Sequence, residues 1–191
     1  MTDKFQGKYR IRSARLQNWD YGWNAMYFVT ICTQGRACFF GDVAGEKMEL
    51  TRIGEIAERY WNEIPQHFPF VKLDQYVVMP NHVHGIIVID KPVDNNIGAT
   101  LETPNLGVST ITTNNRCTAK ASKKWQPATL GVIINQYKRI CTIKAREINR
   151  DFKWQSRFHE HIIQNDRSFK NIQNYINENP LKWGADKFYK K

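Results

Sequence analysis

The segment Met79-Pro-Asn-His-Val-His-Gly85 is followed directly by four β-branched residues, Ile86 to Ile89. A β-branched run of this kind favours a strand, and alternate side chains of a strand lie on the same face. His82 and His84 are therefore expected on one face, roughly 6.6 Å apart along the backbone at about 3.3 Å per residue. Val83 would point into the opposite layer. The pattern predicts a strand that presents a histidine pair on one side and an apolar surface on the other.

Two imidazoles at this spacing can bind one divalent cation. They leave most of the coordination sphere open, which a catalytic metal requires. The alternative is a pair of surface or core-edge histidines, because short motifs often occur by chance. The His82-Val-His84 spacing alone leaves both interpretations open.

Hydrophobic periodicity predicts further elements along the chain. Strands are expected over 25–33, 71–78 and 154–164, and helices over 51–64, 130–150 and 166–180, with Thr51 and Asp166 as helix caps. The order is strand, helix, strand, strand, helix, strand, helix. That order predicts an α+β sandwich of ferredoxin-like or RRM-like type, with a mainly antiparallel sheet and helices on one face.

The length of 191 residues suits a single domain over 1–191. From about residue 91 to residue 129 the periodicity gives way to Asn, Thr, Gly, Pro and Lys. A gap of this length inside a compact domain indicates a functional loop or a disordered insertion. A basic tail over about 181–191 ends the chain.

The formal net charge of +10 indicates a polyanionic partner. Nucleic acid fits better than a membrane, because no apolar run approaches the roughly 20 residues that span a bilayer. The polar segment 1–15 lacks the apolar core of a signal peptide. Four scattered cysteines form no Cys-x-x-Cys pair, so we expect a reducing cytoplasm.

Basic side chains near an aromatic residue can grip a phosphate backbone and stack a base. The basic part of the 91–129 loop contains such a group, although a solvated linker is equally compatible with it. Further basic residues decorate the polar side of the predicted 130–150 helix and the tail. The DNA-binding candidates are Lys123, Lys124, Trp125, Lys138, Arg139, Lys144 and Lys182.

Tyr175 and Asn179 lie at i and i+4 of the last predicted helix, so they are neighbours on its surface. The amide oxygen of Asn179 can be a third, hard metal ligand, and the phenol of Tyr175 can then reach a phosphate held by that metal. The alternative is a core-edge tyrosine followed by an ordinary helix C-terminal asparagine. Tyr137 is a competing nucleophile, but it lies in the apolar stripe of its helix and is expected in the core.

Together, Pro80-Asn-His-Val-His84 and Tyr175-Ile-Asn-Glu-Asn-Pro180 resemble the single-tyrosine HUH transposases, and among them the REP-associated tyrosine transposases. The resemblance covers about residues 20–183 and is interrupted by the 91–129 loop. Further matches are Tyr27-Phe-Val-Thr30, Phe40-Gly41, Val77-Val-Met-Pro80, Trp154-Gln155 and Glu160-His-Ile-Ile163.

This resemblance implies a metal-dependent endonuclease and strand transferase that acts on single-stranded DNA at hairpin-forming repeats. Tyr175 would attack the scissile phosphate, form a 5′-phosphotyrosine and free a 3′-hydroxyl. His82, His84 and Asn179 match the metal ligands, and the metal would be Mg²⁺ or Mn²⁺. Two imidazoles favour Mn²⁺ over Mg²⁺. Relatives in this group include both monomers and homodimers.

Two other functions stay open. The chain can be a catalytically idle protein that binds hairpin DNA, or an unrelated hydrolase in which the histidine pair activates water. His159-Glu160-His161 is a second His-x-His on the predicted 154–164 strand. It can support the metal ligands or simply lie on the sheet.

Overall fold

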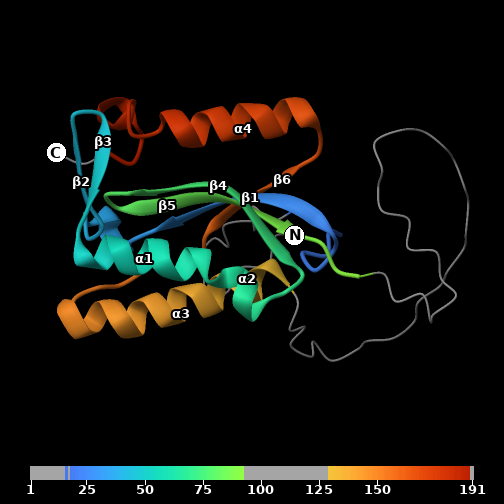
Figure 1. Ribbon diagram of the computed structural model, residues 1–191, viewed down its shortest axis with the longest axis horizontal. Helices are drawn as coiled ribbons and strands as arrows, with labels where there is room; N and C mark the ends of the chain where they lie inside the picture. Colours follow the sequence, from blue (N-terminus) through green and yellow to red (C-terminus); the bar gives the residue numbers. More distant parts are fainter. Residues whose placement is uncertain (1–15, 17, 93–128, 190–191) are drawn as a thin grey trace, which may run out of the picture.

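The structure is a computed structural model that describes residue 16, residues 18–92 and residues 129–189. Four strands form an antiparallel sheet in the order β4-β5-β1-β6 (Figure 1). These are β1 (Ala25–Cys32), β4 (Val71–Met79), β5 (His82–Ile89) and β6 (His159–Ile163). Strands β4 and β5 are the predicted hairpin, with Pro80 and Asn81 at its turn. The α+β class and the antiparallel sheet are confirmed.

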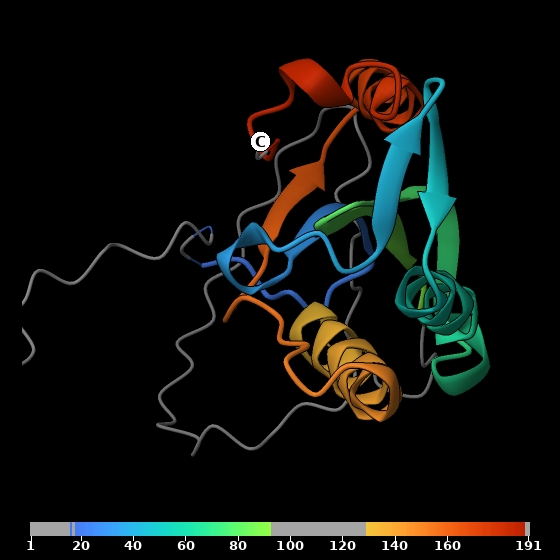
Figure 2. The same ribbon diagram turned by 90° about the vertical axis from the view of Figure 1, so that its left-hand side faces the viewer.

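Helices cover both faces of this sheet (Figures 1 and 2). Helices α1 (Arg52–Asn62), α2 (Ile64–His67) and α3 (Leu130–Ile148) lie on one face, and α4 (Asp166–Glu178) lies on the other. The expectation of helices on a single face is thus wrong for α4. Both faces of the central strands carry apolar side chains, and a strand that is apolar on both faces must be covered twice.

The larger core lies between the sheet and helices α1 and α3. Val29 of β1 and Ile87 of β5 pack there against Trp61 and Ile134. Tyr137 is also in this core, 2% exposed, and its hydroxyl donates to the Ala57 carbonyl at 3.0 Å. Tyr137 is therefore a packing residue, as its position in the helical stripe predicts, and cannot reach a substrate.

A smaller core on the opposite face anchors α4. Ile176 is fully buried against Ile86 of β5 and Ile163 of β6, with Phe169 and Ile172 packed beside it. This stripe of α4 is the one that the sequence predicts. Since Ile176 lies next to Tyr175 in the chain, its burial fixes the height and rotation at which Tyr175 meets the sheet.

The helix caps agree with the sequence within one residue. The Thr51 hydroxyl accepts the Gly54 N–H at 3.2 Å and begins α1. At α4 the cap is Asn165, whose side-chain oxygen accepts the Ser168 N–H at 2.8 Å. Asp166, the predicted cap, is instead the first helical residue, where its negative charge interacts favourably with the helix dipole.

The last strand is shorter than predicted. The predicted span 154–164 is reduced to His159–Ile163, and Trp154 forms only an isolated bridge with Thr33. Arg157 has a φ of 68°, which an extended strand cannot accommodate. A second sheet, β2 (Gly41–Ala44) with β3 (Lys47–Leu50), was not predicted, because four-residue strands carry too little periodicity to detect.

Most of the predicted 91–129 loop lies outside the described residues, together with Lys123, Lys124 and Trp125. In the described ranges, no helix has both the length and the apolar character needed to cross a membrane. The C-terminal tail is described as far as Tyr189 and contains one 3-10 turn, η2 (Trp183–Ala185). That tail folds back onto the end of the sheet that carries the histidine pair.

Candidate active site

The imidazoles of His82 and His84 lie on the α4 face of β5. Their ring centroids are 4.4 Å apart, and the two side chains are 0% and 1% exposed. Val83, between them, is part of the opposite core. The two histidines are thus a buried pair on one face, as the alternation of a strand predicts.

A hydrogen bond to the preceding residue orients His82. Nδ1 of His82 lies 2.9 Å from Oδ1 of Asn81, and Asn81 Nδ2 donates to the carbonyls of Phe188 at 2.8 Å and Arg36 at 3.2 Å. With both amide hydrogens used there, Asn81 Oδ1 can only accept, so the proton of His82 is on Nδ1. Nε2 of His82 then carries a lone pair. It is buried and has no hydrogen-bond partner among the described residues.

His84 is held from both sides. Its Nδ1 lies 2.8 Å from the Thr30 hydroxyl on β1, and its Nε2 lies 3.2 Å from the phenolic oxygen of Tyr175 on α4. In the tautomer in which Nδ1 donates to Thr30, Nε2 accepts the phenolic O–H. The sheet thereby orients the ring so that its unprotonated nitrogen faces the tyrosine.

Burial keeps both imidazoles neutral. It lowers the pKa of His82 to about 3, with the positive charges of Arg36 and Lys187 acting in the same direction. Burial likewise lowers the pKa of His84, helped by neighbouring His82. Since a metal binds only the deprotonated ring nitrogen, the pair is in the ligand form at neutral pH.

This burial predicts an acid-sensitive fold. Below pH 6.5 the unfolded chain protonates His82 while the folded chain does not until about pH 3, so stability is lost as the pH falls through this window. Each such histidine contributes a slope of about 1.4 kcal/mol per pH unit. We expect the free energy of unfolding, from urea titrations over this range, to fall less steeply in His82→Gln. An unchanged slope in that variant would contradict the assignment.

Tyr175 and Asn179 approach the histidines from α4. Tyr175 is 39% exposed and Asn179 is 2% exposed. Oδ1 of Asn179 is buried without a hydrogen-bond partner among the described residues, while its Nδ2 donates weakly to Asp186 at 3.4 Å. The structure therefore brings together all four residues that the two motifs single out, with side chains from one strand and one helix of the same chain.

The donor set fits a divalent cation. Four buried side-chain polar atoms have no partner among the described residues: the indole nitrogens of Trp61 and Trp154, Nε2 of His82 and Oδ1 of Asn179. Only the last two can act as metal ligands, and a native fold rarely leaves such acceptors unpaired. Nε2 of His84 completes a set of two imidazole nitrogens and one amide oxygen. No group of three or more His, Cys, Asp or Glu side chains suited to a metal occurs in the described residues. The candidate set has only two such side chains, His82 and His84, and takes its third donor from the amide of Asn179.

Tyr175 is a weak nucleophile in this environment. Burial raises the pKa of its phenol, and the nearby carboxylate of Asp186 raises it further. A phenol that resists deprotonation needs a positive charge beside it to attack a phosphate. With this raised pKa the Tyr175 hydroxyl is protonated at neutral pH.

The C-terminal segment covers the histidine pair. The Phe188 ring lies 4.6 Å from the His82 ring, and Arg36 holds the segment through a 2.6 Å bond to the Lys187 carbonyl. The guanidinium of Arg36 also lies over the Phe188 ring at 4.8 Å. Arg36 and Phe188 were not predicted from the sequence, because 152 positions separate them and no local pattern marks their contact.

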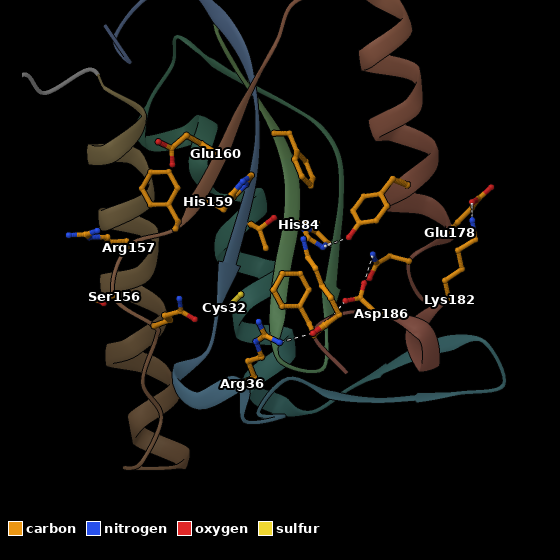
Figure 3. Close-up of a pocket in the computed structure, with 18 of the residues that line it drawn as sticks. Cys32, Arg36, His84, Ser156, Arg157, His159, Glu160, Glu178, Lys182 and Asp186 are labelled. Atoms are coloured by element: carbon orange, nitrogen blue, oxygen red, sulfur yellow. Dashed lines mark hydrogen bonds and ion pairs between the residues drawn. The ribbon is translucent and has the colours of Figure 1, made fainter. Parts of the chain in front are cut away.

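A cleft of about 1540 Å³ opens beside these residues, between α3 and α4. Figure 3 shows Arg36, His84 and Asp186 around this space, with Arg157, His159 and Glu160 across from them. His159 lines the cleft and His161 is exposed, and neither hydrogen-bonds to His82 or His84 in the described structure. The second His-x-His therefore lies on the sheet edge and does not orient the first pair.

Three of the predicted DNA-binding lysines are engaged within the protein. The ammonium of Lys138 donates to the carbonyls of Gln155 at 2.6 Å and Arg157 at 3.1 Å. Two others form exposed ion pairs, Lys144 with Glu147 and Lys182 with Glu178. Of the candidates that the structure describes, Arg139 alone has no polar partner there.

One solved structure shares this fold. A REP-associated tyrosine transposase bound to a REP hairpin matches with a TM-score of 0.56 and 16% identity, over 91% of this chain and 76% of that one. A candidate transposase from Deinococcus radiodurans R1 matches with a TM-score of 0.43 and 11% identity, over 85% of this chain and 95% of that one. The chain has the fold of the REP-associated tyrosine transposase, as its motifs predict.

The sequence comparisons give a nearer relative. An uncharacterised protein of Haemophilus influenzae (strain Rd) is 34% identical over 191 residues, 99% of both chains. The chain belongs to the same family as this protein. No family model matches it.

Proposed function

We propose that the chain is a metal-dependent transposase that cuts and rejoins single-stranded DNA at hairpin-forming repeats. The observation that carries the proposal is the contact between the Tyr175 hydroxyl and Nε2 of His84, 3.2 Å apart, next to two buried ligand atoms without partners. Phosphoryl transfer requires a nucleophile held close to the group that neutralises the phosphate, and this contact places the Tyr175 hydroxyl beside a proposed metal ligand. One chain supplies all four side chains, so a monomer can perform the reaction.

In the proposed reaction the phenolic oxygen of Tyr175 forms a bond to phosphorus, and the bond from phosphorus to the 3′-oxygen breaks. The phenol loses its proton to solvent, and the departing 3′-oxygen takes up one. The product is a 5′-phosphotyrosine and a free 3′-hydroxyl. Because the ester on Tyr175 keeps the energy of the phosphodiester, a returning 3′-hydroxyl reverses the step without ATP.

His82, His84 and Asn179 would hold Mg²⁺ or Mn²⁺, which would neutralise charge on the phosphate. Two imidazole nitrogens favour the later metal. We therefore expect Mn²⁺ to bind about tenfold more tightly than Mg²⁺ in calorimetric titrations of the purified protein. Asn179→Ala should weaken Mn²⁺ binding, whereas Asn135→Ala, elsewhere in the cleft, should not. Equal affinities for the two metals would contradict the ligand set.

The proposal is tested with hairpin-forming single strands, labelled at either end and taken from any palindromes found in the DNA that flanks the gene. After incubation with Mn²⁺ and denaturation, the 3′-labelled strand should migrate with the protein. The 5′-labelled strand should be released as a shorter fragment with a free 3′-hydroxyl. Cleavage of both the 5′-labelled and the 3′-labelled strand without a protein adduct would instead indicate a hydrolase.

A second candidate is a catalytically idle protein that binds hairpin DNA. Burial of Phe188 against the His82 ring favours it, because the C-terminal segment occupies one approach to the site. In the same assay this candidate gives retention of the labelled strand on a native gel and neither a cut nor an adduct. The three outcomes are thus distinct.

A further inference from the structure

A second groove runs beside the cleft, between the outer side of α3 and the segment that follows it. Four basic residues and no acidic residue line this groove, which has a volume of about 480 Å³: Lys138, Arg139, Arg146 and Lys153. The groove and the cleft share three residues, Asn135, Gln155 and Ser156. A polymeric ligand that lies in the cleft at Tyr175 can therefore continue into the groove.

We propose that this groove binds the backbone of single-stranded DNA that extends from the phosphate at Tyr175. The inference rests on the proposed function for the identity of the strand. The lining gives the chemistry, because four basic side chains with no acidic residue in the lining attract phosphates. No other occupant follows so directly from a basic groove that is continuous with a candidate nuclease site.

Two of the four basic residues build the groove. Lys138 ties Gln155 and Arg157 to α3 through its ammonium, and burial lowers its pKa. Arg146 donates from Nε to the Phe152 carbonyl at 3.1 Å, which leaves its other guanidinium hydrogens available. These bonds fix the wall of the groove at its two ends.

The other two basic residues are available to a ligand. Arg139 and Lys153 have no side-chain hydrogen bond or ion pair among the described residues. Ile143 is 46% exposed and lies one helical turn after Arg139 on the same side of α3. An apolar side chain at that position gives a base a surface to lie on while the backbone contacts the cations.

Two exposed basic side chains away from the groove are paired with carboxylates. Lys72 pairs with Asp90 at 2.6 Å, and Arg59 pairs with Glu63 at 2.8 Å. Lys72 is on β4, at the sheet edge opposite to β6, and Arg59 is on α1. Arg59 and Lys72 provide the matched control, because replacing both removes two positive charges at positions distant from the groove.

The test measures fluorescence anisotropy of a labelled oligo(dT) of about 20 nucleotides, with the full chain at several salt concentrations. The double variant Arg139→Gln/Lys153→Gln should bind at least about tenfold more weakly at low salt. Its slope of log affinity against log salt should be smaller by about 1.4, since each lost contact to a single strand contributes about 0.7. Arg59→Gln/Lys72→Gln should keep the wild-type slope.

Equal losses of oligo(dT) affinity in the two double variants would overturn the proposal that the groove binds DNA, because only the net charge of the protein would then matter. A duplex of the same length that binds more tightly than oligo(dT), and loses more affinity in the groove variant, would also overturn it. The proposed function is judged separately. If wild type forms no adduct but the groove variant still weakens oligo(dT) binding, the groove stands and the transposase proposal falls.

Discussion

Replacing Tyr175 with phenylalanine is expected to abolish the covalent DNA adduct and to reduce strand cleavage by at least about a thousandfold. The change removes the attacking oxygen and nothing else from the ring, so no group is left to form the phosphotyrosine. The half-exposed ring keeps its packing against Phe28 and His84. Loss of the single bond to His84 should cost about 1 kcal/mol of stability, visible as a small shift in thermal unfolding.

Tyr189→Phe is the matched control, because Tyr189 is 40% exposed, close to the exposure of Tyr175, and lies in the segment beside the site. It should leave both adduct and cleavage at wild-type levels. A mass spectrum of the digested adduct should place the nucleotide on the peptide that contains Tyr175. Adduct formation by Tyr175→Phe at the wild-type rate would refute the assignment of the nucleophile.

Replacing Gly85 with alanine is expected to destabilise the fold by several kcal/mol. A Cβ at this position would lie 2.2 Å from a ring carbon of Trp61, which is fully buried between β5 and α1. Overpacking of a core typically costs about 1–3 kcal/mol, and a fixed indole cannot move aside easily. Gly85 directly follows His84, so the strain should also shift that imidazole.

Gly184→Ala is the control for this substitution, because a Cβ there meets no atom within 4 Å. Urea unfolding should give a large loss for the Gly85 variant and a change within about 0.5 kcal/mol for the Gly184 variant. The double variant Gly85→Ala/Trp61→Leu should recover part of the loss if the indole is the cause. Similar stabilities of the two glycine variants would show that Trp61 can rearrange.

Local periodicity was enough to predict most of the elements and the pairing of side chains within them. Alternation along β5 placed His82 and His84 on one face, and the helical repeat placed Tyr175 above Asn179. Both are consequences of backbone geometry over a few residues. The meeting of the two pairs followed only from the resemblance, because periodicity does not specify which face of the sheet a later helix covers.

Contacts between distant parts of the chain could not be predicted. Asn81 joins His82 to both Arg36 and Phe188, and these bonds span 45 and 107 positions. The sheet face that α4 covers was predicted wrongly for a related reason, since it depends on the second apolar side of β5. The early part of the predicted last strand was lost to the left-handed backbone at Arg157, which no side-chain pattern reveals.

Diffraction at a wavelength that excites manganese, from crystals grown with Mn²⁺, tests the central claim most directly. We predict one anomalous peak in contact with His82 Nε2, His84 Nε2 and Asn179 Oδ1, and beside the phenol of Tyr175. A peak bound elsewhere, or no peak between the two imidazoles at saturating Mn²⁺, would contradict the account.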